Sequence, residues 1–185
     1  MGKKAERTRK LIREEAYRLF AEKGFKEVTM TDVCEKTGLS RGGLYRHYSS
    51  TSEIFSEILS QEYAIDGRME KKESAEDILK EMLDAIKHEI MDKELSLSLA
   101  IYEFANLGNE NLFIRINENA KKRWMSLINY GMEKGEFKKV DGERVTDLIL
   151  YYYQGLRMWS RVIPFEQDIA EHYAETVREL LLENR

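Results

Sequence analysis

The sequence predicts an all-α protein of about nine helices, with an N-terminal three-helix helix-turn-helix domain and a C-terminal helical bundle. Three observations support this fold class. Apolar residues recur at intervals of three and four along the 185-residue chain, without a convincing alternating segment. Residues 29–48 spell two short helices joined by a glycine turn. The chain has 42% hydrophobic residues and a single proline, which suits a sizeable helical core.

The first helix is expected over residues 5–23. Ile12, Ala16, Leu19 and Phe20 repeat at helical spacing and form its inward face.

The next two helices are indicated by their end signals. Thr29 and Asp32 form a Thr-x-x-Asp start, which is a variant of the capping box. Gly38 can adopt the left-handed backbone that ends a helix, and Ser40 stands where the following helix needs an N-cap. Two short helices joined in this way are typical of the helix-turn-helix, whose second helix enters the major groove of DNA.

The composition of the second short helix favours nucleic-acid contact. Adjacent Gly42 and Gly43 each cost about 1 kcal/mol relative to alanine in a helix interior, but they let a helix start approach another backbone closely. Cationic, aromatic and imidazole side chains follow that suit phosphate oxygens and guanine edges: Arg41, Tyr45, Arg46 and His47. The alternative is a glycine-weakened connector with ordinary surface cations.

The distribution of charge supports the DNA-binding interpretation. Residues 1–50 hold 12 lysines and arginines against 7 acidic residues, a net charge of +5, whereas residues 51–185 hold 18 against 27, a net charge of −9. A chain with an overall charge of −4 therefore concentrates its positive charge around the candidate reading helix.

Residues 8–68 resemble the DNA-binding domain of the TetR family of bacterial transcriptional regulators. The matching residues are Ile12, Ala16, Leu19, Phe20, Gly24-Phe25, Thr29, Asp32-Val33-Cys34, Gly38-Leu39-Ser40 and Gly43-Leu44-Tyr45-Arg46-His47-Tyr48. One position departs from the family pattern. Many relatives carry a phosphate-binding lysine at the start of the fourth helix, where this chain has Thr51, which retains a hydroxyl but no charge.

We expect the DNA contacts to come from the helix-turn-helix and from a basic N-terminal arm. The arm would comprise Lys3, Lys4, Arg7 and Arg9. The expected DNA-binding residues are Thr29, Thr31, Ser40, Arg41, Gly42, Gly43, Tyr45, Arg46, His47, Thr51, Lys3 and Lys4.

The fourth helix is expected to start at a capping box of Ser50 and Glu53 and to continue towards Arg68. The polar run that follows predicts a boundary between a DNA-binding domain, residues 1–68, and a ligand-binding and dimerisation domain, residues 69–185. Helices are then expected at 75–91, 94–107, 110–134, 143–161 and 165–184, with a loop over 135–142.

The last two predicted helices indicate a homodimer. The helix over 143–161 is apolar on nearly every side and must therefore be covered on more than one face. Two such helices from each of two chains would form a four-helix bundle, and the family resemblance implies the same interface. The expected interface residues are Tyr152, Leu156, Tyr173, Val177, Leu180 and Leu181. The alternative is a buried hairpin in a monomer.

The family resemblance also implies that a small apolar or amphipathic effector binds the C-terminal domain and releases the DNA operator, which would be palindromic. The expected lining residues are His88, Tyr102, Phe113, Trp124, Met125, Tyr151, Met158 and Trp159. Any of these aromatics could instead be ordinary core. The predicted function is thus a homodimeric repressor; the alternative is a DNA-binding regulator whose C-terminal domain binds a protein and has no inducer.

Several classes of function are excluded by the composition. The three histidines and the lone cysteine lack metal-ligand spacing, no phosphate or dinucleotide fingerprint is present, and no nucleophile and base can be paired. We therefore expect no metal, no cofactor and no enzyme activity. Cys34 is expected in the core beside Val33, and the absence of a membrane span or secretory signal predicts a cytoplasmic protein.

Overall fold

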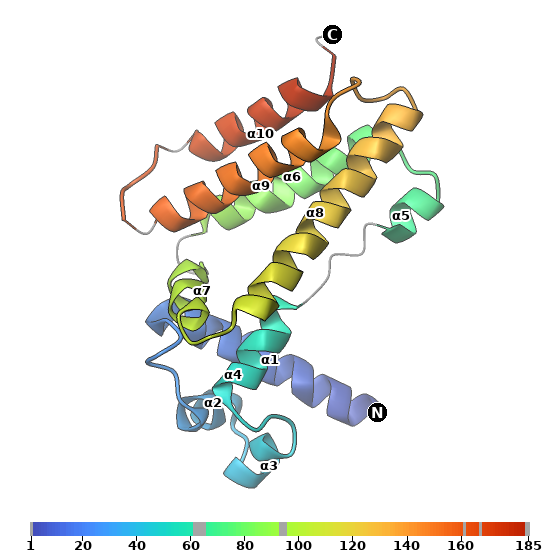
Figure 1. Cartoon of the computed structure of the whole chain (residues 1–185). Helices are drawn as coiled ribbons and strands as arrows, with labels where there is room; N and C mark the ends of the chain where they lie inside the picture. Colours follow the sequence, from blue (N-terminus) through green and yellow to red (C-terminus); the bar gives the residue numbers. More distant parts are fainter. Residues whose placement is uncertain (1, 61–65, 93–95, 161, 167, 184–185) are drawn as a thin grey trace. The chain divides into compact units, whose positions relative to one another are not determined.

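In the computed structural model, residues 2–60, 66–92, 96–160, 162–166 and 168–183 are described. These residues form ten α-helices and no strand (Figure 1), which confirms the all-α prediction. The helices are α1 (Lys3–Lys23), α2 (Met30–Thr37), α3 (Arg41–Tyr45), α4 (Thr51–Leu59), α5 (Asp66–Glu70), α6 (Ala75–Met91), α7 (Ser98–Ala105), α8 (Glu110–Glu133), α9 (Gly142–Trp159) and α10 (Ile169–Leu181). None of these helices is long and apolar enough to cross a membrane.

The observed helix bounds match the sequence pattern best where a cap is present. α6 begins after the N-cap Ser74 and spans the predicted residues 75–91. α1 begins two residues earlier than predicted, and α9 and α10 are shorter at one or both ends. The predicted continuation of the fourth helix runs into residues 61–65, which lie outside the described residues. α5, which the sequence analysis did not separate from that helix, accounts for the tenth helix.

The chain packs as two compact units. Unit 1 contains α1–α4, α7 and the first residues of α8; unit 2 contains α5, α6, the rest of α8, α9 and α10. The sequence-based division at residues 68 and 69 assigned α7 to the C-terminal half, whereas its packing puts it with the N-terminal helices.

Aromatic packing explains why α7 belongs to unit 1. The ring of Phe104 lies 4.6 Å from that of Phe25 and 5.1 Å from that of Phe55, measured between centroids. Phe20 completes this fully or nearly buried cluster. The neighbouring Glu103 carboxylate accepts hydrogen bonds from the backbone amides of Phe25 at 2.7 Å and Lys26 at 3.0 Å. α7 is thereby fastened to the loop between α1 and α2.

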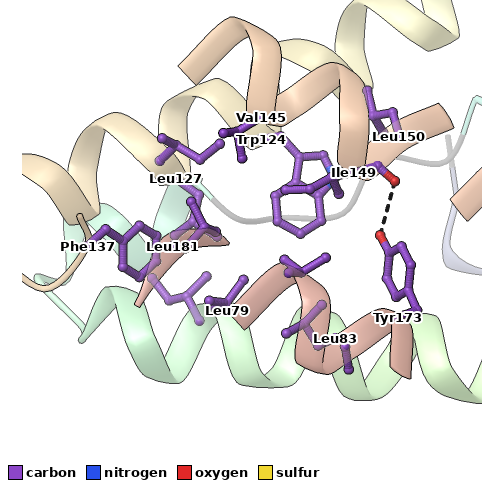
Figure 2. Packing of buried hydrophobic residues seen from close by; sticks show 14 of the residues in the cluster. Leu79, Leu83, Trp124, Leu127, Phe137, Val145, Ile149, Leu150, Tyr173 and Leu181 are labelled. Atoms are coloured by element: carbon purple, nitrogen blue, oxygen red, sulfur yellow. Dashed lines mark hydrogen bonds between the residues drawn. The ribbon is translucent and has the colours of Figure 1, made fainter. Parts of the chain in front are cut away.

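Unit 2 has its own core, built from one face of each of its long helices (Figure 2). Leu79 and Leu83 of α6 pack with Trp124 of α8, Ile149 of α9 and Tyr173 of α10, and all five are buried. The Tyr173 hydroxyl donates a hydrogen bond to the Ile149 carbonyl at 3.3 Å. The tyrosine therefore satisfies its polar atom inside the core and ties α10 to α9.

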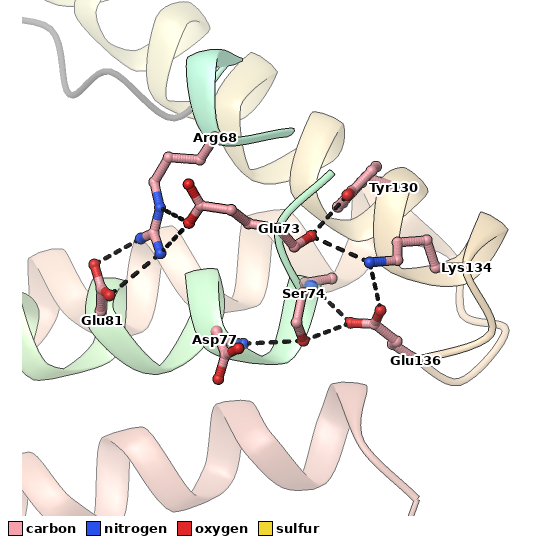
Figure 3. Close-up of polar contacts among 9 residues, drawn as sticks. Arg68, Glu73, Ser74, Asp77, Glu81, Tyr130, Lys134 and Glu136 are labelled. Carbon is pink, nitrogen blue, oxygen red and sulfur yellow. Dashed lines mark hydrogen bonds and ion pairs between the residues drawn. The ribbon is translucent and has the colours of Figure 1, made fainter. Parts of the chain in front are cut away.

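A polar cluster anchors the start of α6 in unit 2 (Figure 3). The Glu136 carboxylate, from the predicted loop after α8, accepts hydrogen bonds from the Ser74 hydroxyl at 2.9 Å and the Ala75 amide at 2.6 Å. Lys134 forms an ion pair with the same carboxylate at 2.7 Å. Burial tends to raise the pKa of Glu136, but these donors outweigh it and lower the pKa to about 2. The carboxylate thus remains charged at the positive end of the α6 dipole.

Candidate nucleic-acid interface and cavity

The predicted capping box of the first helix of the helix-turn-helix is present at the start of α2. The Thr29 amide donates to Asp32 Oδ2 at 2.8 Å, and the Asp32 amide donates to Thr29 Oγ1 at 3.2 Å. Hydrogen bonds from the Thr29 side chain and backbone, together with Lys23, lower the pKa of Asp32 to about 2. Cys34 and Val33 of α2 are buried, as predicted. The position of α2 is therefore fixed by both its cap and its inward face.

The turn and the start of α3 also follow the sequence prediction. Gly38 has a φ of 71° in the left-handed region, where a residue with a side chain would be strained. Ser40 Oγ accepts a hydrogen bond from the Gly43 amide at 3.2 Å. A Cβ on Gly43 would lie 3.2 Å from that same oxygen, whereas a Cβ on Gly42 would meet open space. A side chain at Gly43 would thus crowd the capping oxygen, and Gly42 leaves the outer side of the helix start bare.

The outer surface of the helix-turn-helix presents hydrogen-bond donors. Arg41, Tyr45 and Arg46 of the α3 segment are exposed, and Tyr45 has 54% of its surface accessible. Arg41 Nη2 donates to Thr31 Oγ1 at 3.1 Å, which holds the guanidinium beside the start of α2. Thr29, Thr31, Ser40 and Gly42 are exposed, while His47 is half-buried and Gly43 is buried. Nine of the ten DNA-binding residues expected between Thr29 and Thr51 are therefore exposed or half-buried, and Gly43 is the buried one.

A cluster of charges behind α3 was not foreseen from the sequence. Arg9 of α1 donates to the His47 carbonyl at 3.1 Å, and its guanidinium lies 4.4 Å from the centre of the Tyr48 ring. Glu57 of α4 pairs with both Arg9 and Arg13, and these contacts lower its pKa despite its partial burial. The cluster fixes the end of α3 against α1 and α4. Its signal in the sequence was weak, since arginine at four-residue spacing on a helix usually lies at the surface.

The structure places the residues of the expected basic N-terminal arm in α1. Lys3, Lys4, Arg7 and Arg9 all lie within α1, and Arg9 is engaged with Glu57 and the His47 carbonyl. Lys3 and Lys4 are exposed in the first turn of this helix. They present positive charge from the first turn of α1.

The start of α4 differs in detail from the predicted capping box. Ser50 Oγ accepts from the Glu53 amide at 3.2 Å, as expected, but the Glu53 carboxylate accepts from the amide of Ser49 at 2.7 Å instead of that of Ser50. Thr51 is the first residue of α4 and is half-buried. Thr51 therefore lies at the amide end of α4.

Comparison with known proteins addresses this geometry directly. Residues 12–58, which include α2 and α3, match the family model described as "Bacterial regulatory proteins, tetR family". The chain is 29% identical over 140 residues to the HTH-type transcriptional regulator YfiR of Bacillus subtilis, covering 70% of this chain and 67% of that protein. It is 26% identical over 139 residues to the HTH-type transcriptional repressor KstR2 of Mycobacterium tuberculosis, covering 68% of this chain and 66% of that protein.

The chain belongs to the TetR family. Solved structures agree on the fold. A TetR transcription regulator from Haloarcula marismortui superposes with a TM-score of 0.73 at 20% identity, covering 96% of this chain and all of that one (100%). A putative transcriptional regulator from Saccharomonospora viridis, solved in complex with choline, gives 0.74 at 19% identity and covers 97% and 100% of the two chains. Membership confirms the prediction of a DNA-binding transcriptional regulator that is not an enzyme.

Unit 2 of this TetR-family regulator contains a partly open cavity of about 350 Å³. Helices α6, α8, α9 and α10 supply most of its wall, and Arg68 of α5 joins them. Most of the lining is apolar, for example Ile78, Met82 and Trp124, and Glu89 and Tyr153 add polar groups. A largely apolar cavity with a few polar groups is typical of small-molecule sites.

Only one of the eight expected lining residues contributes to this cavity, and that residue is Trp124. Tyr102 and Phe113 belong to unit 1, where Phe113 packs against Phe104. The remaining five lie elsewhere on unit 2: His88, Tyr151, Met158 and Trp159 are exposed, and Met125 is half-buried near Gly142. Aromatic content therefore did not locate the cavity. A better signal was the α6 face that carries Met82 and Ile86 together with Glu89, because it places a carboxylate beside an apolar stripe.

The predicted dimer contacts also need correction. Leu156, Tyr173, Val177 and Leu181 are buried in the core of unit 2 and have no surface to offer a partner. Tyr152 is 37% exposed and Leu180 is half-buried. The exposed α9 face instead includes Leu148, Tyr151, Tyr152, Met158 and Trp159, which recur at three-, four- and seven-residue spacing. Four of the six expected interface residues therefore cover the protein's own core, whereas Tyr152 lies on the uncovered face of α9.

Proposed function

We propose that this TetR-family regulator is a homodimeric repressor that binds a palindromic DNA operator through α3 and is released from it by a small molecule. The DNA-binding part of the proposal rests on the exposed donors Arg41, Tyr45 and Arg46. Beside them, Gly42 leaves the start of α3 open. The net charge of +5 on residues 1–50 would draw this surface to the phosphate backbone. KstR2, one of the relatives, is named a repressor.

The dimer is inferred from the exposed α9 face. Soluble monomers seldom leave a row of large apolar side chains in water, and here Leu148, Tyr151 and Trp159 are each more than half exposed. A two-fold axis through this face would pair two reading helices. The two half-sites of an operator lie about 34 Å apart, which is one helical turn of DNA, and the two helices would need the same separation.

The cavity in unit 2 supports a small-molecule signal over a protein partner. Its volume of about 350 Å³ falls in the range of ligand sites. The Saccharomonospora viridis neighbour was solved with choline, so this fold accommodates a small ligand in at least one case. The ligand would act by binding one of two conformations more tightly and shifting the population away from the DNA-competent one. We place this action in the cytoplasm, where the DNA is accessible.

The DNA-binding part can be tested without knowledge of the operator. The protein would be used to select duplexes from a random-sequence pool, and the enriched duplex would be titrated by fluorescence anisotropy at several salt concentrations. We expect an inverted repeat with half-site centres about 10 base pairs apart, and an affinity that falls steeply as salt rises. Enrichment of no sequence, or an affinity that does not change with salt, would contradict the proposal.

The dimer and the release step have separate tests. Light scattering coupled to size-exclusion chromatography should give twice the mass of one chain, and a monomer at micromolar concentration would argue against paired reading helices. A chemically diverse compound library would then be screened for two coincident effects, a higher melting temperature and weaker binding to the selected duplex. If no compound produces both effects, the result argues against a small-molecule effector and favours the alternative, in which the C-terminal domain binds a protein.

A further inference from the structure

The cavity in unit 2 is elongated along α6. Residues Ile78 and Glu89 of this helix both line it, and eleven residues of α-helix span about 16 Å. Met82 and Ile86 lie between them on the same side, and Trp124 and Leu150 face them from α8 and α9. The long walls are therefore apolar, and the polar groups lie towards the two ends.

The charged groups at the α5 end are paired with one another (Figure 3). Arg68 Nε donates to Glu73 Oε2 at 2.7 Å. The two terminal nitrogens of the same guanidinium donate to Glu81 at 2.6 and 3.2 Å, in a bidentate pair. Arg68 thus has two carboxylate partners, and both carboxylate oxygens of Glu81 accept hydrogen bonds from this one arginine.

The polar groups at the other end are also engaged. The Tyr153 hydroxyl donates a hydrogen bond to the Glu89 carboxylate. Arg157 Nη1 donates to the Tyr153 oxygen at 2.9 Å and lies 3.9 Å from Glu89 Oε2. Burial raises the pKa of Tyr153, which keeps its hydroxyl protonated as the donor. Arg123, the remaining charged residue of the lining, has an interaction of its own as well.

An anionic ligand would compete with Glu73 and Glu81 for Arg68, and a cationic ligand would compete with Tyr153 and Arg157 for Glu89. Breaking the partly buried contacts of Glu89 leaves its charge without a partner, and burying a new charge without a partner costs still more. An uncharged molecule avoids both penalties and gains from the apolar walls. A volume of about 350 Å³ lies in the range of small-molecule sites.

From these contacts we infer that the cavity binds an uncharged, mainly apolar small molecule, and that it discriminates against cations and anions of the same shape. This inference rests on the proposed ligand-responsive function, which it sharpens from a small apolar or amphipathic effector to an uncharged one.

The test uses three naphthalene derivatives that match in size and differ in charge: 2-naphthalenemethanol, 2-naphthylmethylammonium and 2-naphthoate. Their binding to the full chain would be measured by isothermal titration calorimetry and by thermal unfolding. We expect the alcohol to bind at least about tenfold more tightly than either ion. At ten times its Kd, the alcohol should raise the melting temperature by about 3–6 °C.

Two variants on α8 locate the binding. Ala120 lines the cavity, and Ala120→Trp would fill it and should abolish the response to the alcohol. Ser126 is exposed on the same helix and does not line the cavity, so Ser126→Trp should bind the alcohol as the parent protein does. If Ala120→Trp fails to fold, the comparison of the three probes on the parent protein still decides the question of charge.

The outcomes separate this inference from the proposed function. Tighter binding of the ammonium or the carboxylate would overturn the inference, and so would the failure of all three probes to bind. If another compound released the operator DNA, the proposed ligand-responsive function would still stand. Binding of the alcohol that survives Ala120→Trp would likewise overturn it. If Ala120→Trp loses the binding of the alcohol, the inference is supported, even where the alcohol leaves the affinity for operator DNA unchanged. An unchanged affinity would then contradict the proposed release mechanism alone.

Discussion

Glu136→Gln is expected to destabilise unit 2 by removing the charge that caps α6. The carboxylate accepts hydrogen bonds from the Ser74 hydroxyl and from the amides of Ala75 and Glu76, at 2.6–3.2 Å, and pairs with Lys134. Glutamine has nearly the same shape and retains one acceptor oxygen, but it cannot pair with the lysine or oppose the helix dipole as an anion.

The expected magnitude follows from the pKa of Glu136. Hydrogen bonds from Lys134, Ser74 and the backbone outweigh the effect of burial and lower this pKa from 4.5 to about 2. That difference corresponds to about 3 kcal/mol between the charged and the neutral carboxyl group. The side chain is 22% exposed, so water screens part of this interaction, and we expect a loss of about 2 kcal/mol. For a chain of this length, such a loss lowers the melting temperature by about 4–8 °C.

The dependence on pH distinguishes a charge effect from a general loss of packing. A carboxyl group whose folded-state pKa is lowered contributes stability above its unfolded pKa and loses it as the pH falls towards the folded value. The stability gap between the parent protein and Glu136→Gln should therefore be complete at pH 7 and shrink progressively between pH 4.5 and about 2. Urea unfolding followed by circular dichroism at several pH values would measure this gap.

The matched control is Glu133→Gln, which removes the same charge from an exposed residue at the end of α8. We expect it to change the stability by less than about 0.5 kcal/mol. Equal effects of the two substitutions at pH 7 would refute the reasoning. A gap for Glu136→Gln that stays constant down to acid pH would refute it as well.

Four further outcomes are expected. Arg46→Ala should weaken binding to the selected duplex and reduce the slope of log K against log salt by about 1 in anisotropy titrations, whereas Lys26→Ala, remote from the reading helix in sequence, should leave the slope unchanged. Trp159→Glu should shift the mass measured by light scattering towards one chain, because it places a charge on the exposed α9 face. Phe104→Ala should cost about 3–5 kcal/mol in urea unfolding, because it empties the centre of the aromatic cluster in unit 1. Glu57→Gln should lower the melting temperature by several degrees, because Arg9 and Arg13 lose their shared carboxylate.

Local signals were sufficient for most of the helix-turn-helix. The caps at Thr29 and Ser40 and the left-handed turn at Gly38 depend on atoms within three or four residues of one another, so a pattern of letters specifies them. The inward positions of α1 and the burial of Cys34 follow equally from helical spacing. For the same reason the sequence missed the charges behind α3, since Glu57 lies 48 residues from Arg9.

By itself, the sequence determined the helical fold class, the caps, the reading head and the concentration of positive charge around it. Only the tertiary structure decided that α7 joins unit 1, that Tyr173 and Leu181 are core, and that the cavity lies beside Met82 and Glu89. The physical reason is that an apolar stripe predicts that a helix face is buried, but it does not identify the element that covers this face. A cavity is even less visible in a sequence, because it arises where side chains from several helices fail to fill the space between them.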